Sequence, residues 1–148
     1  TVDWSQYSVS NFPFNVVQQP GPSNALGLVK FIMPNNMSIY LHDTPTDYLF
    51  ERTERALSHG CIRLEKPAEL AEYVLRNRKG WDKEKVYEYM HKDSPKRINL
   101  DEDIHVQITY LTAFVDELGL INFREDIYNH DKMQLEEIES KMEDVAQL

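Results

Sequence analysis

The chain has 148 residues, 41% of them hydrophobic, and a single cysteine, so we expect one domain with a packed core and no internal disulfide bond. No apolar run approaches the ~18 residues of a membrane span, which excludes a transmembrane segment within this sequence. The net charge of −9 is concentrated in residues 101–148, which carry 13 acidic and 3 basic side chains; without a basic stripe, nucleic-acid binding is not expected.

The first part of the chain is predicted to contain one β-hairpin between two loops. Residues 1–26 hold several turn-forming residues and no clear periodicity, so they are expected to be mostly loop. Two β-rich runs, 28–33 and 38–42, flank a Pro-Asn-Asn turn, which predicts two strands joined as a hairpin. The polar stretch 43–57 follows, and we expect a loop there with one short helical turn.

Two helices are predicted in the middle of the chain. Pro67 suits the first turn of a helix, and apolar residues recur at helical spacing before Gly80 ends the element: Ala68, Ala71, Val74 and Leu75. Asp82 is the expected N-cap of a second helix. This helix runs to about His91, and we expect it to bury Val86, Tyr89 and Met90.

The last third is predicted to contain a second hairpin and a terminal helix. Apolar and polar residues alternate from Ile104, and the run then becomes apolar on both faces up to Val115, which predicts a long strand that is buried on both faces at its far end. A turn at Gly119 leads into a strand over 120–123. From Asp131 an acidic helix places four apolar side chains on one face, which we expect to pack on the chain's own domain, with a partner-binding surface as the alternative: Leu135, Ile138, Met142 and Val145.

The segment most informative about chemistry contains Cys61, which follows a histidine and a glycine and precedes Arg63 by two residues. A thiolate is the reactive form of cysteine, and imidazolium, cationic side chains or a helix N-terminus favour it; this segment has candidates for all three. Gly60 has no β-carbon to block a substrate carbonyl, and consecutive N–H groups in such a turn can point at one oxyanion. An isolated cysteine is more often inert packing, but these neighbours favour an acyl-transfer site.

The block Ser58-His59-Gly60-Cys61-Ile62-Arg63, with His42 nineteen residues before the cysteine, resembles the signature of the L,D-transpeptidase (YkuD-type) catalytic domain of bacterial cell-wall synthesis. Asp43 stands where short members of that family have glycine, which points to the long, multidomain branch. Three further segments resemble that branch: 20–27, 39–45 and 123–128.

The resemblance implies an α+β fold, mainly β: an L,D-transpeptidase-like antiparallel β-sandwich with two or three peripheral helices. It extends from about Trp4 to Asp131, so we assign residues 1–130 to the catalytic domain and 131–148 to a C-terminal acidic amphipathic helix. The family's catalytic domain begins with strands upstream of anything in this sequence. We therefore expect the chain to be the C-terminal portion of that domain, within a longer protein.

Carried over residue by residue, the resemblance implies that Cys61 is the nucleophile and that His42 is the base that takes its proton. His59 would orient or electrostatically support the thiolate, and the backbone N–H groups of His59, Gly60 and Cys61 would form the oxyanion hole. A plain alternative for His42 is a satisfied core histidine, which is the commoner fate of a histidine at a strand end.

Three further residues complete the predicted site. Arg63 would hold a substrate carboxylate or fix the loop; its alternative is a surface ion pair with Glu65 or Glu69. Tyr40 lies two residues before His42 and therefore on the same strand face, so it should also line the pocket. Ser58 is expected to bond within the loop.

The implied reaction has two halves and needs no cofactor or metal. Cys61 attacks the carbonyl of the third residue of a peptidoglycan tetrapeptide stem and the terminal D-alanine leaves. The side-chain amine of a neighbouring stem then displaces the thiol and gives a 3→3 cross-link, whereas water would give L,D-carboxypeptidase activity. The implied partners are donor and acceptor stem peptides, with carbapenem β-lactams as covalent inhibitors and no membrane contact from this fragment. The implied location is the periplasm or cell envelope, where such enzymes serve cell-wall biogenesis and cell shape; an export signal is expected outside this fragment.

Two other classes of function stay open. His42, Asp43, His59 and Cys61 are all zinc-ligand types, but His59 and Cys61 are closer in sequence than the usual zinc pairs and no second cysteine supports a site. Zinc content and alkylation of Cys61 distinguish a metal site from a free thiol. The other alternative is a non-catalytic cell-wall binding module, which predicts muropeptide binding without an acyl-enzyme.

Overall fold

The structure is a computed structural model that describes residues 2–146, the side chains of 143–146 excepted. The chain forms two compact units, one ending at Ile104 and one beginning at His105. The predicted boundary between a catalytic domain and an acidic helix at residue 130 is of a different kind and stays a prediction. The first unit contains η1 (Trp4–Gln6), β1 (Lys30–Ile32), β2 (Tyr40–His42), η2 (Asp47–Glu51), β3 (Ile62–Arg63), α1 (Pro67–Leu75) and α2 (Lys83–Met90). The second contains β4 (Ala113–Val115), β5 (Ile121–Phe123) and α3 (His130–Ala146).

The sheet of the first unit has the order β1-β2-β3. β1 and β2 pair antiparallel, which confirms the predicted hairpin. β3 pairs parallel to β2, with Leu41 opposite Ile62 and His42 opposite Arg63. Helices combined with small sheets are compatible with the predicted α+β class, but the antiparallel β-sandwich is not confirmed. The described strands are two or three residues long, and one of the pairings is parallel.

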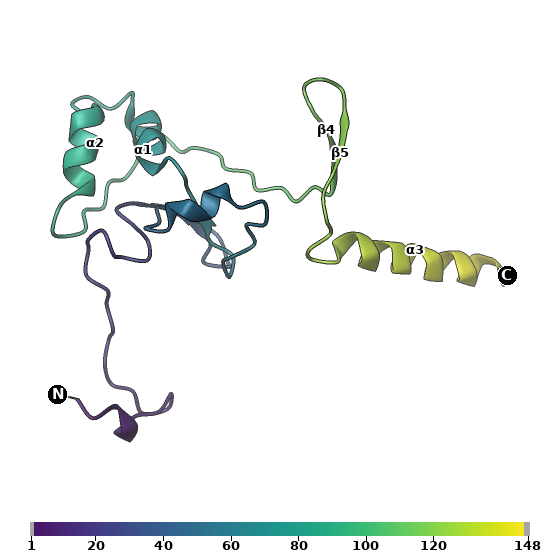
Figure 1. The fold of residues 1–148 in the computed structure, drawn as a ribbon, viewed down its shortest axis with the longest axis horizontal. Coiled ribbons are helices and arrows are strands. Elements are labelled where there is room, and N and C mark those ends of the chain that lie inside the picture. The colour runs from purple at the N-terminus through teal and green to yellow at the C-terminus, as the bar shows by residue number, and fades with distance from the viewer. Residues whose placement is uncertain (1, 147–148) are drawn as a thin grey trace. The chain divides into compact units, whose positions relative to one another are not determined.

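Helices α1 and α2 lie side by side (Figure 1) and supply the small core of the first unit. Ala71 and Leu75 of α1 and Val86 of α2 are buried, as the helical spacing predicts. Pro67 occupies the first turn of α1, where its missing N–H removes no helical hydrogen bond. Partly buried residues from the strands, helices and loops pack around these three: Phe31, Val74, Trp81, Met90 and Ile98.

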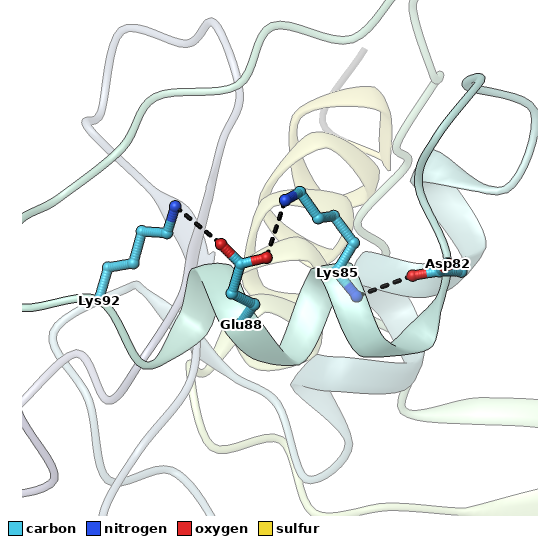
Figure 2. A network of polar contacts seen from close by, with 4 residues as sticks. All are labelled: Asp82, Lys85, Glu88 and Lys92. Atoms are coloured by element: carbon cyan, nitrogen blue, oxygen red, sulfur yellow. Dashed lines mark hydrogen bonds and ion pairs between the residues drawn. The ribbon is translucent and has the colours of Figure 1, made fainter.

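The start of α2 is capped by Asp82, as predicted. Its carboxylate accepts a hydrogen bond from the backbone N–H of Lys85 at 2.8 Å (Figure 2). Further along, the Glu88 carboxylate lies between the amines of Lys85, at 2.8 Å, and Lys92, at 3.1 Å. Hydrogen bonds from these two lysines hold the pKa of Glu88 below its ordinary value. Such exposed pairs contribute little to stability, so the buried Val86 is expected to contribute more than they do to holding α2 against α1.

The second unit contains a β-hairpin of β4 and β5, joined by the predicted turn (Figure 1). Asp116 shapes this turn, because its carboxylate accepts hydrogen bonds from the N–H groups of Leu118 and Leu120. The predicted long strand over 104–115 is wrong apart from its last three residues. A strand needs a partner for its backbone groups, and β4 pairs with β5 over three residues. Its end is not buried on both faces as expected, because Val115 is 64% exposed and only Phe114 is half-buried.

The acidic helix is present as α3, which begins at His130, one residue before the predicted start. The predicted packing of its apolar stripe on its own domain is not found in the described residues, because Leu135, Ile138 and Met142 are 55%, 49% and 67% exposed. A two-stranded hairpin offers too little apolar surface to cover a helix of this length. The side chain of Val145 lies outside the described residues. No helix in the described part of the chain is both long and apolar enough to cross a bilayer.

The first turn of α3 is held by Asp126. Its Oδ1 accepts hydrogen bonds from the backbone N–H of His130 and the hydroxyl of Tyr110, both at 2.9 Å. Its Oδ2 accepts from the N–H groups of Asp131 at 2.9 Å and Lys132 at 3.2 Å. Partial desolvation acts to raise the pKa of Asp126, but these four hydrogen bonds outweigh it, so the pKa lies below its ordinary 3.8. The carboxylate thus satisfies helix donors that have no partner within the helix.

Leu75→Ala is expected to lower the free energy of unfolding of the first unit by about 2–5 kcal/mol, because it leaves a cavity between α1 and α2. The matched control is Glu72→Ala on the exposed face of α1, with an expected change within about 0.5 kcal/mol. Urea denaturation followed by circular dichroism measures both. Equal midpoints for the two variants would contradict the assignment of this core.

Asp126→Asn is expected to make the first turn of α3 insensitive to acid. Since the folded-state pKa of Asp126 is lowered, its contribution is fully present above the ordinary carboxyl pKa of 3.8 and is lost as the pH falls through the lower folded value. Amide NMR signals of His130, Asp131 and Lys132 between pH 6 and 2 measure this. Asp103→Asn, in an exposed irregular segment, should titrate like the parent chain; the same behaviour in Asp126→Asn would disprove the capping role.

Candidate active site

The pairing of β2 with β3 brings together residues that are far apart in the sequence. Tyr40 and His42 lie on one face of β2, because alternate residues of a strand share a face. Arg63 is in register with His42 in the parallel pair, so its side chain projects from the same face. Cys61 lies directly before β3, two residues before Arg63. The two short strands and the residue before β3 thus bring a thiol, an imidazole, a phenol and a guanidinium to one pocket.

An open pocket of about 500 Å³ lies at this face. All seven residues selected from the sequence line it: Tyr40, His42, Ser58, His59, Gly60, Cys61 and Arg63. The remaining wall is mostly apolar and comes from the turns before β1 and β2 and from the loop before Ser58: Leu26, Met37, Ser38, Ile39 and Leu57. The structure therefore brings the selected residues together, while their chemical roles stay predictions.

His42 is buried, with 5% of its surface exposed, and its ring has one polar and one aromatic neighbour. Its Nδ1 lies 2.5 Å from the backbone oxygen of Asp43, and the ring of Tyr40 meets it edge-on with centroids 5.8 Å apart. A carbonyl oxygen only accepts hydrogen bonds, so Nδ1 carries the proton of the neutral ring. The lone pair of the neutral imidazole is therefore on Nε2, which is the atom that can act as a base.

Cys61 is half-buried and has no disulfide partner. Its Sγ lies 3.9 Å from the backbone oxygen of Ser38, within range of a weak hydrogen bond from the thiol. Burial raises the pKa of Tyr40 above its ordinary 10.0, and the charge of the Cys61 thiolate and a hydrogen bond with it act in the same direction. The sulfur thus has two polar neighbours, Tyr40 and Ser38, and lines an open pocket.

Sequence reasoning did not select Ser38, which the hairpin turn brings to the thiol. Ser38 has a positive φ of 55°, and the side chain of Asn35 organises the turn around it. The Asn35 amide donates to the backbone oxygens of Met33 and Ile39, and its oxygen accepts from the N–H groups of Met37 and Ile39. An asparagine directly after Pro34 was the available signal.

The loop before Cys61 is held by Ser58, in agreement with its expected role. The Ser58 hydroxyl donates to the backbone oxygen of Cys61 at 2.7 Å and accepts from the N–H of Gly60 at 3.1 Å. Gly60 has a φ of 140°, a conformation that residues with a β-carbon rarely adopt. The predicted oxyanion hole of the His59, Gly60 and Cys61 N–H groups stays a prediction, and in this structure the Gly60 N–H donates to the Ser58 hydroxyl.

Arg63 is half-buried and lines the pocket. The alternative of a surface ion pair has no support within residues 2–146, where Glu69 pairs with Lys66 instead and no ion pair includes Arg63. The predicted role of Arg63 in holding a substrate carboxylate stays a prediction. The zinc alternative lacks a ligand set in the described residues, since no three His, Cys, Asp or Glu side chains gather there as metal ligands would.

Comparisons with known proteins identify the family to which this chain belongs. A sequence model of the YkuD family, described as the L,D-transpeptidase catalytic domain, matches residues 2–101, which include every residue of the pocket. A protein of Haemophilus influenzae named "Putative L,D-transpeptidase" is 39% identical over 133 residues, which are 89% of this chain and 26% of that protein. The chain therefore spans about a quarter of that relative's length. On these matches, the chain belongs to the YkuD family of L,D-transpeptidase catalytic domains.

Proposed function

We propose that this chain carries the active site of a cysteine L,D-transpeptidase that forms 3→3 cross-links between peptidoglycan stem peptides. The observation that supports this most directly is the pocket in which Cys61, His42 and Arg63 meet. A nucleophile, a base with a defined tautomer and an anion-binding side chain are the minimum set for acyl transfer from a peptide that ends in a carboxylate.

In the first half-reaction, Nε2 of His42 takes the thiol proton of Cys61, and the thiolate attacks the carbonyl of the third residue of a donor tetrapeptide stem. The peptide C–N bond then breaks, the His42 imidazolium returns the proton to the leaving amine, and D-alanine departs. The product is a thioester on Cys61. The backbone oxygen of Asp43 supports this step, because it holds the proton of His42 on Nδ1.

Charge in this step develops at two places. The oxyanion of the tetrahedral intermediate would be stabilised by the backbone N–H groups of Cys61 and His59, which lie in the loop that Ser58 fixes. The carboxylate of the donor's terminal D-alanine would bind Arg63, which is half-buried in the same pocket. The imidazole of His59, exposed at the rim, would support the thiolate electrostatically.

In the second half-reaction, the side-chain amine of a neighbouring stem attacks the thioester and the thiolate leaves. The thiolate is a better leaving group than an alkoxide, which suits capture by an amine. Water in place of the amine gives the L,D-carboxypeptidase reaction on the same thioester. We place this chemistry in the periplasm or cell envelope, where stem peptides occur.

Cys61→Ala is expected to abolish both the cross-link and the D-alanine release. Incubation of the parent chain with a carbapenem should add one inhibitor mass, since Cys61 is the only thiol. A tetrapeptide muropeptide should add the donor mass minus that of alanine. Intact-mass spectrometry measures both adducts. Cross-linking that persists in Cys61→Ala, or an adduct on another residue, would refute the mechanism, and binding without any adduct would indicate a cell-wall binding module.

His42→Ala is expected to slow acylation of Cys61 by about 100-fold or more, the range typical of a lost general base. The matched control is His91→Ala, because the Nδ1 of His91 also contacts a backbone oxygen, that of Tyr87 at 2.8 Å, but His91 does not line the pocket. The rate of carbapenem adduct formation measures both variants. Equal rates for the two would remove His42 from the reaction.

A further inference from the structure

The side chain of Asp43 is held between two segments of the chain. Its Oδ2 accepts a hydrogen bond from the backbone N–H of Leu28 at 2.7 Å, fifteen residues away. Its Oδ1 accepts from the N–H of Thr44, also at 2.7 Å, and the Asp43 N–H donates to the backbone oxygen of Val29 at 2.9 Å. Both oxygens of this carboxylate are thus used to fix backbone.

Gly27 leaves the room that this carboxylate occupies. A β-carbon at residue 27 would overlap the Asp43 side chain, and Gly27 also has a φ of +58°. The two residues therefore fit together, since a side chain at 27 and a carboxylate at 43 exclude each other. The contact is made by the turn that precedes β1, so it ties that turn to the end of β2.

The Thr44 N–H, which donates to Oδ1 of Asp43, belongs to the same peptide unit as the Asp43 carbonyl. A peptide unit is planar and trans, so its N–H and C=O point in opposite directions. Holding the N–H with Oδ1 therefore fixes the direction of the carbonyl oxygen on the other side. That oxygen contacts Nδ1 of His42. Thr44 is itself buried, which leaves this peptide unit little freedom to rotate.

We propose that the Asp43 carboxylate, seated against Gly27, is a positioning residue that fixes the proton of His42 on Nδ1 and leaves Nε2 free to accept the proton of Cys61. This inference rests on the proposed function and extends it, because it assigns the orientation of the base to a side chain outside the pocket lining. Both carboxylate oxygens are required: one is anchored on Leu28 and the other holds the Thr44 peptide.

The first test reads the tautomer of His42 directly and needs no substrate. In the full chain labelled with ¹⁵N-histidine, at a pH where the ring is neutral, His42 should show a protonated Nδ1 and a bare Nε2. Asp43→Ala should shift both nitrogens toward a mixture of tautomers. Asp43→Asn, which keeps the size of the side chain but sets an amide nitrogen against one of the two N–H donors, should move them in the same direction. The matched control, Asp47→Asn at the exposed start of η2, should leave them unchanged.

The second test separates positioning from binding. The maximal rate of carbapenem acylation should fall about 10-fold in Asp43→Ala, the lower end of the loss seen when a group that orients a metal-ligating histidine is removed. The half-saturating carbapenem concentration should stay within about twofold, because Arg63 and the pocket wall are untouched. If Asp43→Ala does not fold, Asp43→Asn decides both measurements.

A folded Asp43 variant with the parent tautomer and the parent acylation rate overturns the proposal. This result differs from the result expected if the proposed function is wrong. If the proposed function is wrong, the parent chain forms no adduct at all, and the tautomer measurement still decides whether Asp43 positions His42.

Discussion

Two backbone pairs between β2 and β3 create the candidate active site. They set Leu41 against Ile62 and His42 against Arg63; Tyr40 and Cys61, which lies directly before β3, line the same pocket as His42 and Arg63. Nothing in the local sequence of either strand would bring an imidazole to a thiol nineteen residues further along. The hairpin turn, the Ser58 loop and the Asp43 carboxylate refine this arrangement, but each acts on residues that the parallel pair has already brought together.

The features that sequence could predict are those with a local physical cause. Pro67 at a helix start and Asp82 as an N-cap act within one turn, and the structure has both where they are expected. The β1–β2 hairpin has its turn residues between its strands, so its antiparallel pairing also follows from neighbours in the chain. The site block, from Ser58 to Arg63, is contiguous and could be selected as a unit, and the pocket contains all of its selected members.

What could not be predicted depends on contacts between distant segments. The alternating pattern from Ile104 fits a strand, but a pattern does not supply the partner whose backbone groups a strand needs. The parallel pairing of β3 could likewise not be predicted from the sequence, since a strand of two residues has no periodicity. The hydrogen bond of the Gly60 N–H was unpredictable for the same reason. A donor in a turn can bond to an oxyanion or to another group of the turn, and the Gly60 N–H donates to the Ser58 hydroxyl.

The shortness of β3 has a consequence for how the site responds to heat. β3 is two residues long, whereas the buried contacts of the first unit lie mainly between α1 and α2. Local opening of so small a strand requires little apolar surface to be exposed, and regions of this kind open at lower free energy than the core. Opening of β3 separates the thiol from the imidazole while the helices remain packed. The arrangement of the pocket residues is therefore the more labile property of this unit, and a sample with full helical signal can already have lost the pairing of β2 with β3.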